Sequence, residues 1–441
     1  MPLTVPSTIF PTEERFVNVI REATPGTVPA TSGTTFPMVN LEPDDKPLWL
    51  LDESLRGGMG DIYDFLQGPL YAEVTIPETP VYVDMMGHPL YNTLGDYTQS
   101  APAATPNTTT TAPAVAGATS LTVASGTSFT VGMWIQVYAA SSTGPAEIVK
   151  VLSGASTSIT LDPTTPIRFP HASGATVTNT TVAAGTYSHA FSLLTSGFLG
   201  TGNFQNFAQP PTHCWTDRTQ VPQIGGNPGG ARQYADSCFQ TLVLTGNAEK
   251  LLSWNGAFSS YVGQLATVAP AASVSSIRAM PDFTSIVQLA TSGALAPVYD
   301  IVEWQLTLSR QLKVFFTNDG SQNPYVIGRG KLGVSGKLTF SPAIDETALL
   351  YMLQNTQPQL QILTTNNLLT SNPLYQAMQI DVPFCDFDTS KINSGDVLFG
   401  YDVTFKSHHT NTTRNTIVPT GWSGGFSACK VTLSNAVPIF F

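Results

Sequence analysis

The stretch from Gly328 to Gly333, GRGKLG, matches the dinucleotide-binding pattern G-x-G-x-x-G literally. In that fold the loop follows a strand and opens a helix, whose backbone amides meet the pyrophosphate. In this sequence a strand-like pattern follows the glycines. We therefore assign them to a hairpin turn rather than to a cofactor site.

Three groups of histidines are the next candidates for chemistry. His408 and His409 are adjacent, but no third ligand lies at a suggestive spacing, so we expect exposed loop histidines rather than a metal site. No nucleophile motif such as G-x-S-x-G accompanies His189, so we expect a hydrogen-bonded residue within a β layer. His213 and Cys214 are neighbours without a third group to orient them.

The carboxylates are sparse and show no acid–base pairing in the sequence. The most noticeable are Asp44, Asp45, Glu78, Asp84 and Asp386. A glycosidase needs two carboxyl groups roughly 5–10 Å apart, a separation that spacing alone neither shows nor excludes. We also find no P-loop and no calcium-binding loop. The sequence therefore predicts no catalytic residue, no cofactor site and no metal site.

Four cysteines occur, at Cys214, Cys238, Cys385 and Cys429. None forms a C-x-x-C pair or has zinc-ligand spacing, so we expect buried or half-buried thiols. The N-terminus lacks the basic and apolar regions of a signal peptide, and no apolar run approaches the ~20 residues of a membrane-spanning helix. We expect a soluble protein made in a cytoplasm.

The composition indicates a β-rich protein. The chain has 441 residues, of which 42% are hydrophobic and only 11% are charged. Thr, Ser, Asn, Gln, Gly and Pro make up the polar balance, which argues against a helical bundle. The net charge of -11 and the pI of about 4.9 argue against a protein that grips DNA or an anionic membrane. They do not exclude a surface that DNA passes without binding.

One long hairpin dominates the second half of the sequence. Residues 304–316 alternate with period two and are interrupted only at Arg310, and residues 331–340 repeat the alternation after a turn at 317–330. At roughly 3.3 Å per residue the first strand spans about 40 Å. The predicted apolar face comprises Trp304, Leu306, Leu308, Leu312, Val314, Phe316, Leu332, Val334, Leu338 and Phe340.

This hairpin needs partners, because an isolated two-stranded ribbon is marginal in water and its open edges aggregate. The chain does not obviously supply enough strands both to cover the apolar face and to pair the edges. We therefore expect neighbouring copies to contribute, by closing the sheet into a ring.

A small β domain interrupts the first half of the sequence. Residues 98–114 are rich in Pro, Thr and Ala and are assigned to a linker. Short strands are expected near 120–123, 133–138, 146–152 and 158–161, separated by Gly/Ser turns. The flanking segments belong together, so the small domain is interpreted as an insertion.

Outside the insertion, two segments share the order strand, short helix, long loop, strand, strand. The first has strands at 70–79, 237–246 and 251–263 and a helix within 83–95. The second has strands at 331–340, 375–384 and 395–405 and a helix at 345–354. The echo lies in element order and not in residue identity, and we interpret it as a duplication.

Several segments together resemble the tail tube proteins of long, non-contractile-tailed (siphovirus-type) bacteriophages. The N-terminal segment 14–30 and the strand region 48–77, LWLLDESLRGGMGDIYDFLQGPLYAEVTIP, are similar to the start of a first tube module. Segments 186–191 and 231–263 are similar to its close, and 298–409 to a second module. The insertion resembles small β domains that decorate such tubes. The order of the segments carries the likeness, since no single motif is diagnostic.

The resemblance implies a mostly β fold with two tandem tail-tube modules, each a β-sandwich or barrel with a short helix and a long hairpin, and an inserted all-β domain. The expected division assigns 1–97 and 181–270 to the first module, 98–114 to the linker and 115–180 to the inserted domain. Residues 271–297 form a connector, 298–410 the second module and 411–441 a C-terminal extension that matches no tube element.

The function that the resemblance implies is structural, without enzymatic chemistry. Rings of the chain stack into a hollow virion tail tube, made in the host cytoplasm, through which DNA passes without specific binding. Two modules per chain favour a trimeric, pseudo-sixfold ring, with a six-chain ring as the alternative. The implied partners are other copies, a tape measure protein and the tail terminator and tip proteins, with no membrane.

Two other classes of protein remain open. A capsid decoration or S-layer-like surface protein would share this composition but would not need a duplicated long hairpin. A carbohydrate-active enzyme or binding module would need a cleft with aromatic residues and paired carboxylates.

Overall fold

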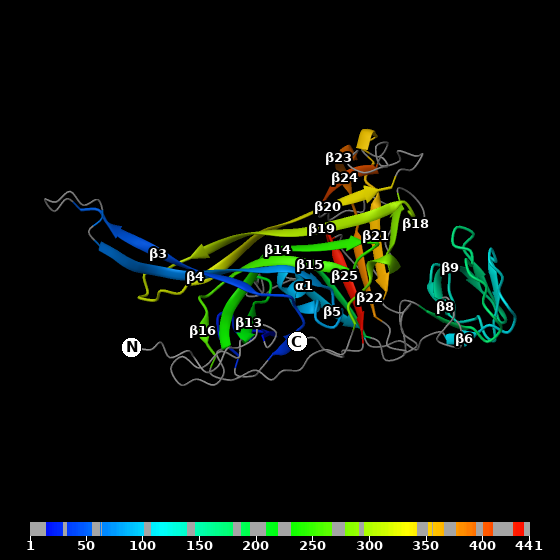
Figure 1. Cartoon of the computed structure of the whole chain (residues 1–441), viewed down its shortest axis with the longest axis horizontal. Coiled ribbons are helices and arrows are strands. Elements are labelled where there is room, and N and C mark those ends of the chain that lie inside the picture. The colour runs from blue at the N-terminus through cyan, green and yellow to red at the C-terminus, as the bar shows by residue number, and fades with distance from the viewer. Residues whose placement is uncertain are drawn as a thin grey trace, which may run out of the picture.

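The computed structural model of the chain is mostly β, with three antiparallel sheets and one α-helix among the residues it describes (Figure 1). Those residues are 15–29, 33–54, 62, 64–100, 107–138, 146–179, 187–194, 209–218, 231–266, 278–290, 295–341, 352–354, 356–365, 376–393, 400–408 and 427–435. The expected β-rich class is thus confirmed.

The largest sheet has twelve strands. Eight of them follow one another in the order β3-β4-β15-β14-β19-β20-β24-β23, while β13, β1 and β2 continue from one end of β14 and β16 pairs beside them. The strands are β1 (Phe16–Arg21), β2 (Thr34–Phe36), β3 (Glu42–Asp52), β4 (Asp64–Pro80), β13 (His213–Arg218), β14 (Ala231–Asn247), β15 (Ser253–Ser260), β16 (Gln264–Leu265), β19 (Ile301–Phe315), β20 (Val326–Phe340), β23 (Asp386–Asn393) and β24 (Gly400–Ser407).

A seven-stranded sheet combines strands from both halves of the chain. Its order is β18-β17-β21-β22-β25-β12-β5. The strands are β5 (Gly95–Ser100), β12 (Tyr187–Leu193), β17 (Ile286–Ala290), β18 (Ala296–Pro297), β21 (Gln359–Thr365), β22 (Ala377–Val382) and β25 (Lys430–Asn435), and a 3₁₀ turn, η3 (Asp282–Thr284), precedes β17.

The single α-helix among the described residues, α1 (Gly87–Leu94), packs between these two sheets. It ends at Gly95, whose φ of 93° is in the left-handed region and whose N–H donates to the carbonyl of Tyr91. Its apolar residues Leu90 and Leu94 are fully buried in one core with Phe191 of β12, Leu308 of β19 and other residues of both sheets. One continuous core therefore unites the two halves of the sequence.

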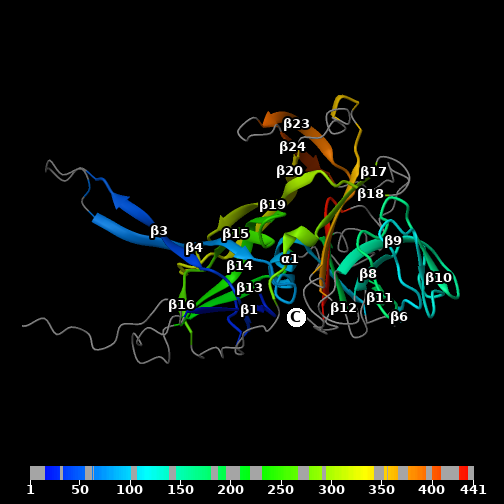
Figure 2. The same cartoon turned by 45° about the vertical axis from the view of Figure 1, so that its right-hand side comes forward.

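A six-stranded sheet forms a separate unit with its own core, seen to one side of the molecule in Figure 2. Its order is β6-β11-β8-β9-β10-β7. The strands are β6 (Asn107–Thr109), β7 (Ser120–Thr122), β8 (Trp134–Tyr138), β9 (Ala146–Gly154), β10 (Ser158–Leu161) and β11 (Thr176–Asn179). The strands on either side of it in the chain, β5 and β12, pair with each other, and Ser188 lies opposite Ser100.

Three segments that the sequence left without regular structure contain strands. The expected linker, 98–114, contributes the end of β5 and all of β6. The sequence did not indicate β6, because Asn107–Thr109 lacks the apolar residues that mark most strands. The expected connector, 271–297, contains η3, β17 and β18. The expected C-terminal extension, 411–441, supplies β25, which lies between β22 and β12 inside the seven-stranded sheet.

The repeated order of elements in the two halves corresponds only in part to a repeated pattern of strand pairing. In the first half β15 lies between β4 and β14, and in the second β24 lies between β20 and β23. The predicted strand at 375–384, however, is β22 of the other sheet. Most of the helix expected at 345–354 lies outside the described residues.

Candidate functional site

The long hairpin is formed by β19 and β20, which pair from Ile301 with Phe340 to Phe315 with Val326. Its base is buried in the core that it shares with α1, and its tip is only partly covered. Buried residues of the predicted apolar face are Trp304, Leu306, Leu308, Val334, Leu338 and Phe340. Half-buried ones are Leu312, Val314, Phe316 and Leu332, with Phe316 one residue beyond the end of β19.

Arg310, which interrupts the apolar alternation, has a specific structural role. It is 7% exposed, and its guanidinium donates to the carbonyl oxygens of Thr93 and Leu94 at the end of α1 and of Gly330 in β20. These α1 carbonyls have no partner within the helix, and they lie at the negative end of its dipole. Arg310 therefore ties the hairpin to the helix.

Both edges of the hairpin are paired within the chain at its base, up to Ser309 on β19 and from Val334 on β20. Residues Thr241–Asn247 of β14 pair with β19, and residues Tyr401–Ser407 of β24 pair with β20. Strands distant in the sequence therefore supply partners at the base of the hairpin. The expectation that neighbouring copies close the sheet into a ring stays a prediction. The two end strands of this eight-stranded run, β3 and β23, each pair with one neighbouring strand among the described residues.

The β3–β4 hairpin projects from the body as an arm, as both views show (Figures 1 and 2). Leu50 lies opposite Leu66, and Leu51 lies opposite Phe65. Because neighbours along a strand point to opposite faces, apolar side chains occupy both faces of the arm. They are about half exposed: Leu48 42%, Trp49 54%, Leu50 54%, Leu51 46%, Phe65 58% and Leu66 56%.

Apolar side chains on both faces of an exposed ribbon are unusual for a monomer and mark an interaction surface. The sequence analysis did not single out these residues. The sequence feature that could have indicated them is LWLL, residues 48–51, followed by an acidic residue. Four consecutive apolar residues do not fit a strand with one buried face.

The face of the eight-stranded run opposite the core is polar. Thr307, Ser335 and Thr404 belong to it, and three of its lysines form ion pairs. Lys337 lies 3.0 Å from Asp402. Lys406 with Asp388, and Lys46 with Glu73, form further ion pairs. This face therefore presents hydroxyl groups together with three lysines whose charges are neutralised by carboxylates.

The G-x-G-x-x-G stretch lies inside β20, opposite residues 309–313 of β19. It is neither at a helix N-terminus nor in the hairpin turn. The expected turn assignment is wrong because β20 begins at Val326, within the segment assigned to the turn, and leaves 316–325 as the connection.

The histidines are held by hydrogen bonds rather than grouped for catalysis. His189 is fully buried in β12 with Nδ1 2.8 Å from the Tyr97 hydroxyl, as expected for a residue within a β layer. His408 is not an exposed loop residue, because its Nδ1 lies 2.8 Å from Asp386 Oδ2 and its ring stacks on Phe384. His409 lies outside the described residues.

His213 and Cys214 are both buried in β13. His213 Nδ1 lies 3.1 Å from Asn92 Nδ2, and burial lowers the pKa of His213 well below its ordinary value. Burial raises the pKa of Cys214 to about 12. Both groups are therefore neutral at neutral pH and do not form a nucleophile–base pair.

The carboxylates singled out in the sequence have different partners. Asp44 and Asp45 lie near Lys46 and Arg232, respectively. Ser253 donates a hydrogen bond to Glu78, and Asp84 is buried. Within the part of the chain that the structure describes, no three His, Cys, Asp or Glu side chains are grouped to hold a metal ion.

A pair of buried carboxylates that the sequence did not suggest lies where β1, β13, β14 and β20 meet. Glu22 accepts hydrogen bonds from Thr212 Oγ1 at 2.6 Å and from the N–H of Asp236 at 2.8 Å. Arg329, 8% exposed, contributes a favourable charge to both. Through these hydrogen bonds Glu22, next to β1, links β14 to Thr212 at the start of β13.

No known protein-family model matches this chain, and no curated protein matches it either. Among the described residues, no helix is long and apolar enough to span a membrane.

Proposed function

We propose that this chain is a structural virion protein that self-assembles into stacked rings and forms the hollow tail tube of a siphovirus-type phage. The observation that carries the proposal is the eight-stranded run with a covered face, a polar face and, among the described residues, an edge strand at each end. Pairing β3 of one copy with β23 of the next would continue the sheet from chain to chain. A ring closed in this way has no edges left to aggregate.

In the proposed ring the polar face of the run lines the lumen. Duplex DNA carries about one negative charge per 1.7 Å of its axis, so an array of free lysines would hold it at many phosphates. Three cations of this face, Lys337, Lys406 and Lys46, are paired with carboxylates, and the whole chain carries a net charge of -11. Such a surface lets DNA slide without specific binding.

The strand arrangements β4-β15-β14 and β20-β24-β23 support the idea of two tandem tube modules in one chain. Three chains then give six modules, so a trimeric, pseudo-sixfold ring is preferred over a ring of six chains. The β3–β4 arm, with apolar residues on both faces, is suited to contact another copy in the same ring or in the next. A tape measure protein inside the tube, and terminator and tip proteins at its ends, complete the proposed set of partners.

Negative-stain electron microscopy of the purified chain at low and high concentration tests the proposal. Rings or tubes with a central pore are expected, and their symmetry distinguishes three chains from six. Monodisperse monomers at every concentration, also in the presence of isolated tail tips as initiators, would contradict it. The capsid-decoration, S-layer-like and carbohydrate-active alternatives would then be tested next.

A further inference from the structure

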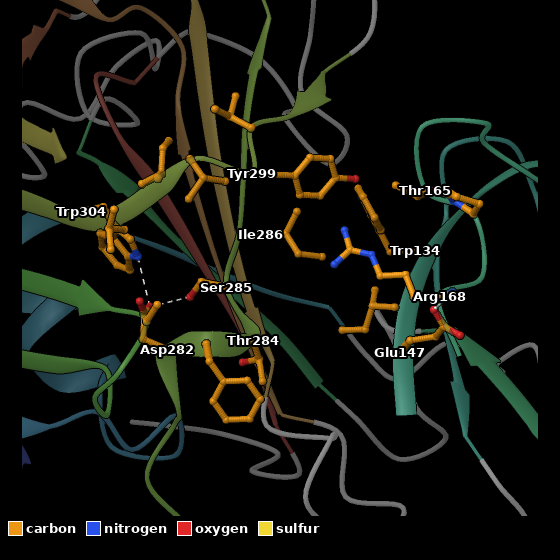
Figure 3. A pocket seen from close by; sticks show the side chains of 18 of the residues that line it. Trp134, Glu147, Thr165, Arg168, Asp282, Thr284, Ser285, Ile286, Tyr299 and Trp304 are labelled. Atoms are coloured by element: carbon orange, nitrogen blue, oxygen red, sulfur yellow. Dashed lines mark hydrogen bonds between the residues drawn. The ribbon is translucent and has the colours of Figure 1, made fainter. Parts of the chain in front are cut away.

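A cleft of about 510 Å³ lies between the six-stranded sheet and the rest of the chain (Figure 3). Trp134, Glu147, Thr165 and Arg168 line it from the six-stranded unit. The segments 282–287 and 298–304 line it from the other side. Small-molecule sites have volumes of roughly 300–1,000 Å³ and occur preferentially where two domains meet.

The two walls of the cleft are held in place by direct contacts. The hydroxyl of Tyr299 donates to the carbonyl of Thr164 at 3.0 Å, and Lys150 Nζ donates to the carbonyl of Leu295 at 3.1 Å. Beside them, Trp134 is buried in a small cluster with Leu363 and Ala377 of the seven-stranded sheet. The cleft is therefore preformed, so that a ligand need not order its walls on binding.

Aromatic rings line the cleft and remain accessible. Tyr299 is 60% exposed, Phe283 55% and Phe169 47%. The guanidinium carbon of Arg168 lies 5.1 Å from the centre of the Tyr299 ring. Exposed aromatic residues gathered around one hollow mark a binding surface.

A buried carboxylate lies on the wall opposite Arg168 (Figure 3). Asp282 is 4% exposed, and its Oδ1 accepts hydrogen bonds from Trp304 Nε1 at 3.1 Å and from Ser285 Oγ at 2.6 Å. In the described part of the chain no cation lies within ion-pair distance of it. These bonds fix the orientation of the carboxylate, so that it is an acceptor already in position.

We propose that this cleft binds a sugar ring of a saccharide. A pyranose presents a C–H face that packs on an aromatic ring, and hydroxyl groups that bond to a fixed carboxylate and a guanidinium. A purely apolar ligand would displace water from the exposed Arg168 guanidinium without replacing its hydrogen bonds, which is costly. A polyanion would meet the carboxylate of Asp282. The inference is independent of tube assembly, because all the groups belong to one chain.

Saturation-transfer NMR with the full chain and single sugars tests the proposal, using glucose, galactose, mannose and N-acetylglucosamine as probes. We expect transfer to at least one of them, and a titration then gives its dissociation constant. The matching linear oligosaccharide is titrated in parallel. Equal affinity for both indicates recognition of a single ring, and tighter binding of the oligomer indicates an extended glycan.

Paired variants locate the binding. Tyr299→Ala is expected to weaken it by about tenfold, because an aromatic contact is lost. Tyr299→Phe keeps the ring and loses only the bond to Thr164, so binding should be retained. Asp282→Asn should weaken binding, while Tyr325→Ala, which removes a 67% exposed tyrosine outside the cleft, should not.

Absence of transfer to every probe would overturn the proposal. Equal binding by wild type, Tyr299→Ala and Tyr299→Phe would also overturn it, because the sugar would then lie elsewhere. Far-UV circular dichroism confirms that each variant is folded. Since binding is measured on the unassembled chain, failure here leaves the tube proposal to its own test.

Discussion

The Nε of Arg310 donates a hydrogen bond to the carbonyl oxygen of Thr93 at 2.5 Å, and so joins β19 to the last turn of α1 across 217 positions of sequence. Burial, with a smaller contribution from Arg329, lowers the pKa of Arg310 to about 10. The guanidinium therefore stays charged at neutral pH. Its hydrogen bonds to carbonyls at the negative end of a helix dipole offset part of the free-energy cost of its desolvation.

Arg310→Leu should lower the free energy of unfolding by about 2–4 kcal/mol, because it leaves buried carbonyl groups without a donor. Urea unfolding followed by circular dichroism measures the change. Lys313→Leu is the matched control, since Lys313 is exposed on the same strand, and its effect should stay within about 0.5 kcal/mol. Equal effects of the two substitutions would show that the helix contact contributes nothing.

Asp236 should make the chain less stable as the pH rises. Burial, and then the nearby Glu22, raise its pKa from 3.8 to about 7, while Arg329 and the N–H of Ile327 act in the opposite direction. The unfolded carboxyl releases its proton at lower pH than the folded one. Stability from this group is therefore complete below about pH 4 and is lost as the pH rises through 7, by up to about 4 kcal/mol.

Asp236→Asn tests this, because asparagine tolerates the left-handed backbone at this position, where φ is 52°. Urea unfolding at pH 5 and pH 8 should show a smaller loss of stability for the variant than for the wild type. Burial also raises the pKa of Asp381 to about 6, so Asp381 contributes to the loss of stability that the wild type shows with rising pH. The variant Asp381→Asn measures this second contribution separately. An unchanged slope in Asp236→Asn would contradict the prediction.

The parts of the fold that local pattern specifies could be predicted from the sequence. The alternation of Trp304, Leu306 and Leu308 identified β19, and the segment around Leu90 identified α1. The pairing of β19 with β14 could not be predicted, because it depends on contacts between distant segments. The sequence therefore did not indicate that strands of the same chain pair with the base of this hairpin.

Residues whose role depends on a distant partner were also missed. Arg310 was recognised only as an interruption, since its partner Thr93 lies in another element. β25 has the alternation of a short strand, but its place between β22 and β12 is a matter of topology. The apolar residues of the arm, such as Trp49, could not be recognised from period-two alternation, because apolar side chains lie on both of its faces.

The four cysteines should be unreactive in the folded chain. All are buried, and burial raises the pKa of Cys214 and Cys238 to about 12 and that of Cys385 and Cys429 above its ordinary range. Because the thiolate is the reacting form, dithionitrobenzoate at pH 8 should find no thiol in the native protein and four after unfolding in urea. Ser309→Cys, on an exposed position of β19, should add one reactive thiol. Rapid reaction of the native wild type would contradict the burial of these groups.

The arm should be needed for assembly and not for folding. Trp49 and Phe65 are 54% and 58% exposed, with ring centres 6.4 Å apart on one face of the arm. Replacing both by Asp removes little contact within the chain but places two charges on the proposed interface, which are costly to bury. We therefore expect the free energy of unfolding to change by only about 1 kcal/mol and ring formation to be lost.

Sedimentation velocity and negative-stain microscopy at matched concentrations measure the loss of assembly. Val131→Asp is the control, because Val131 is 73% exposed on the six-stranded unit, away from the arm. Assembly of the double variant at the wild-type concentration would show that the apolar residues of the arm are not an interface between copies. Loss of assembly in both variants would point instead to a general effect of added negative charge on a chain whose net charge is already -11.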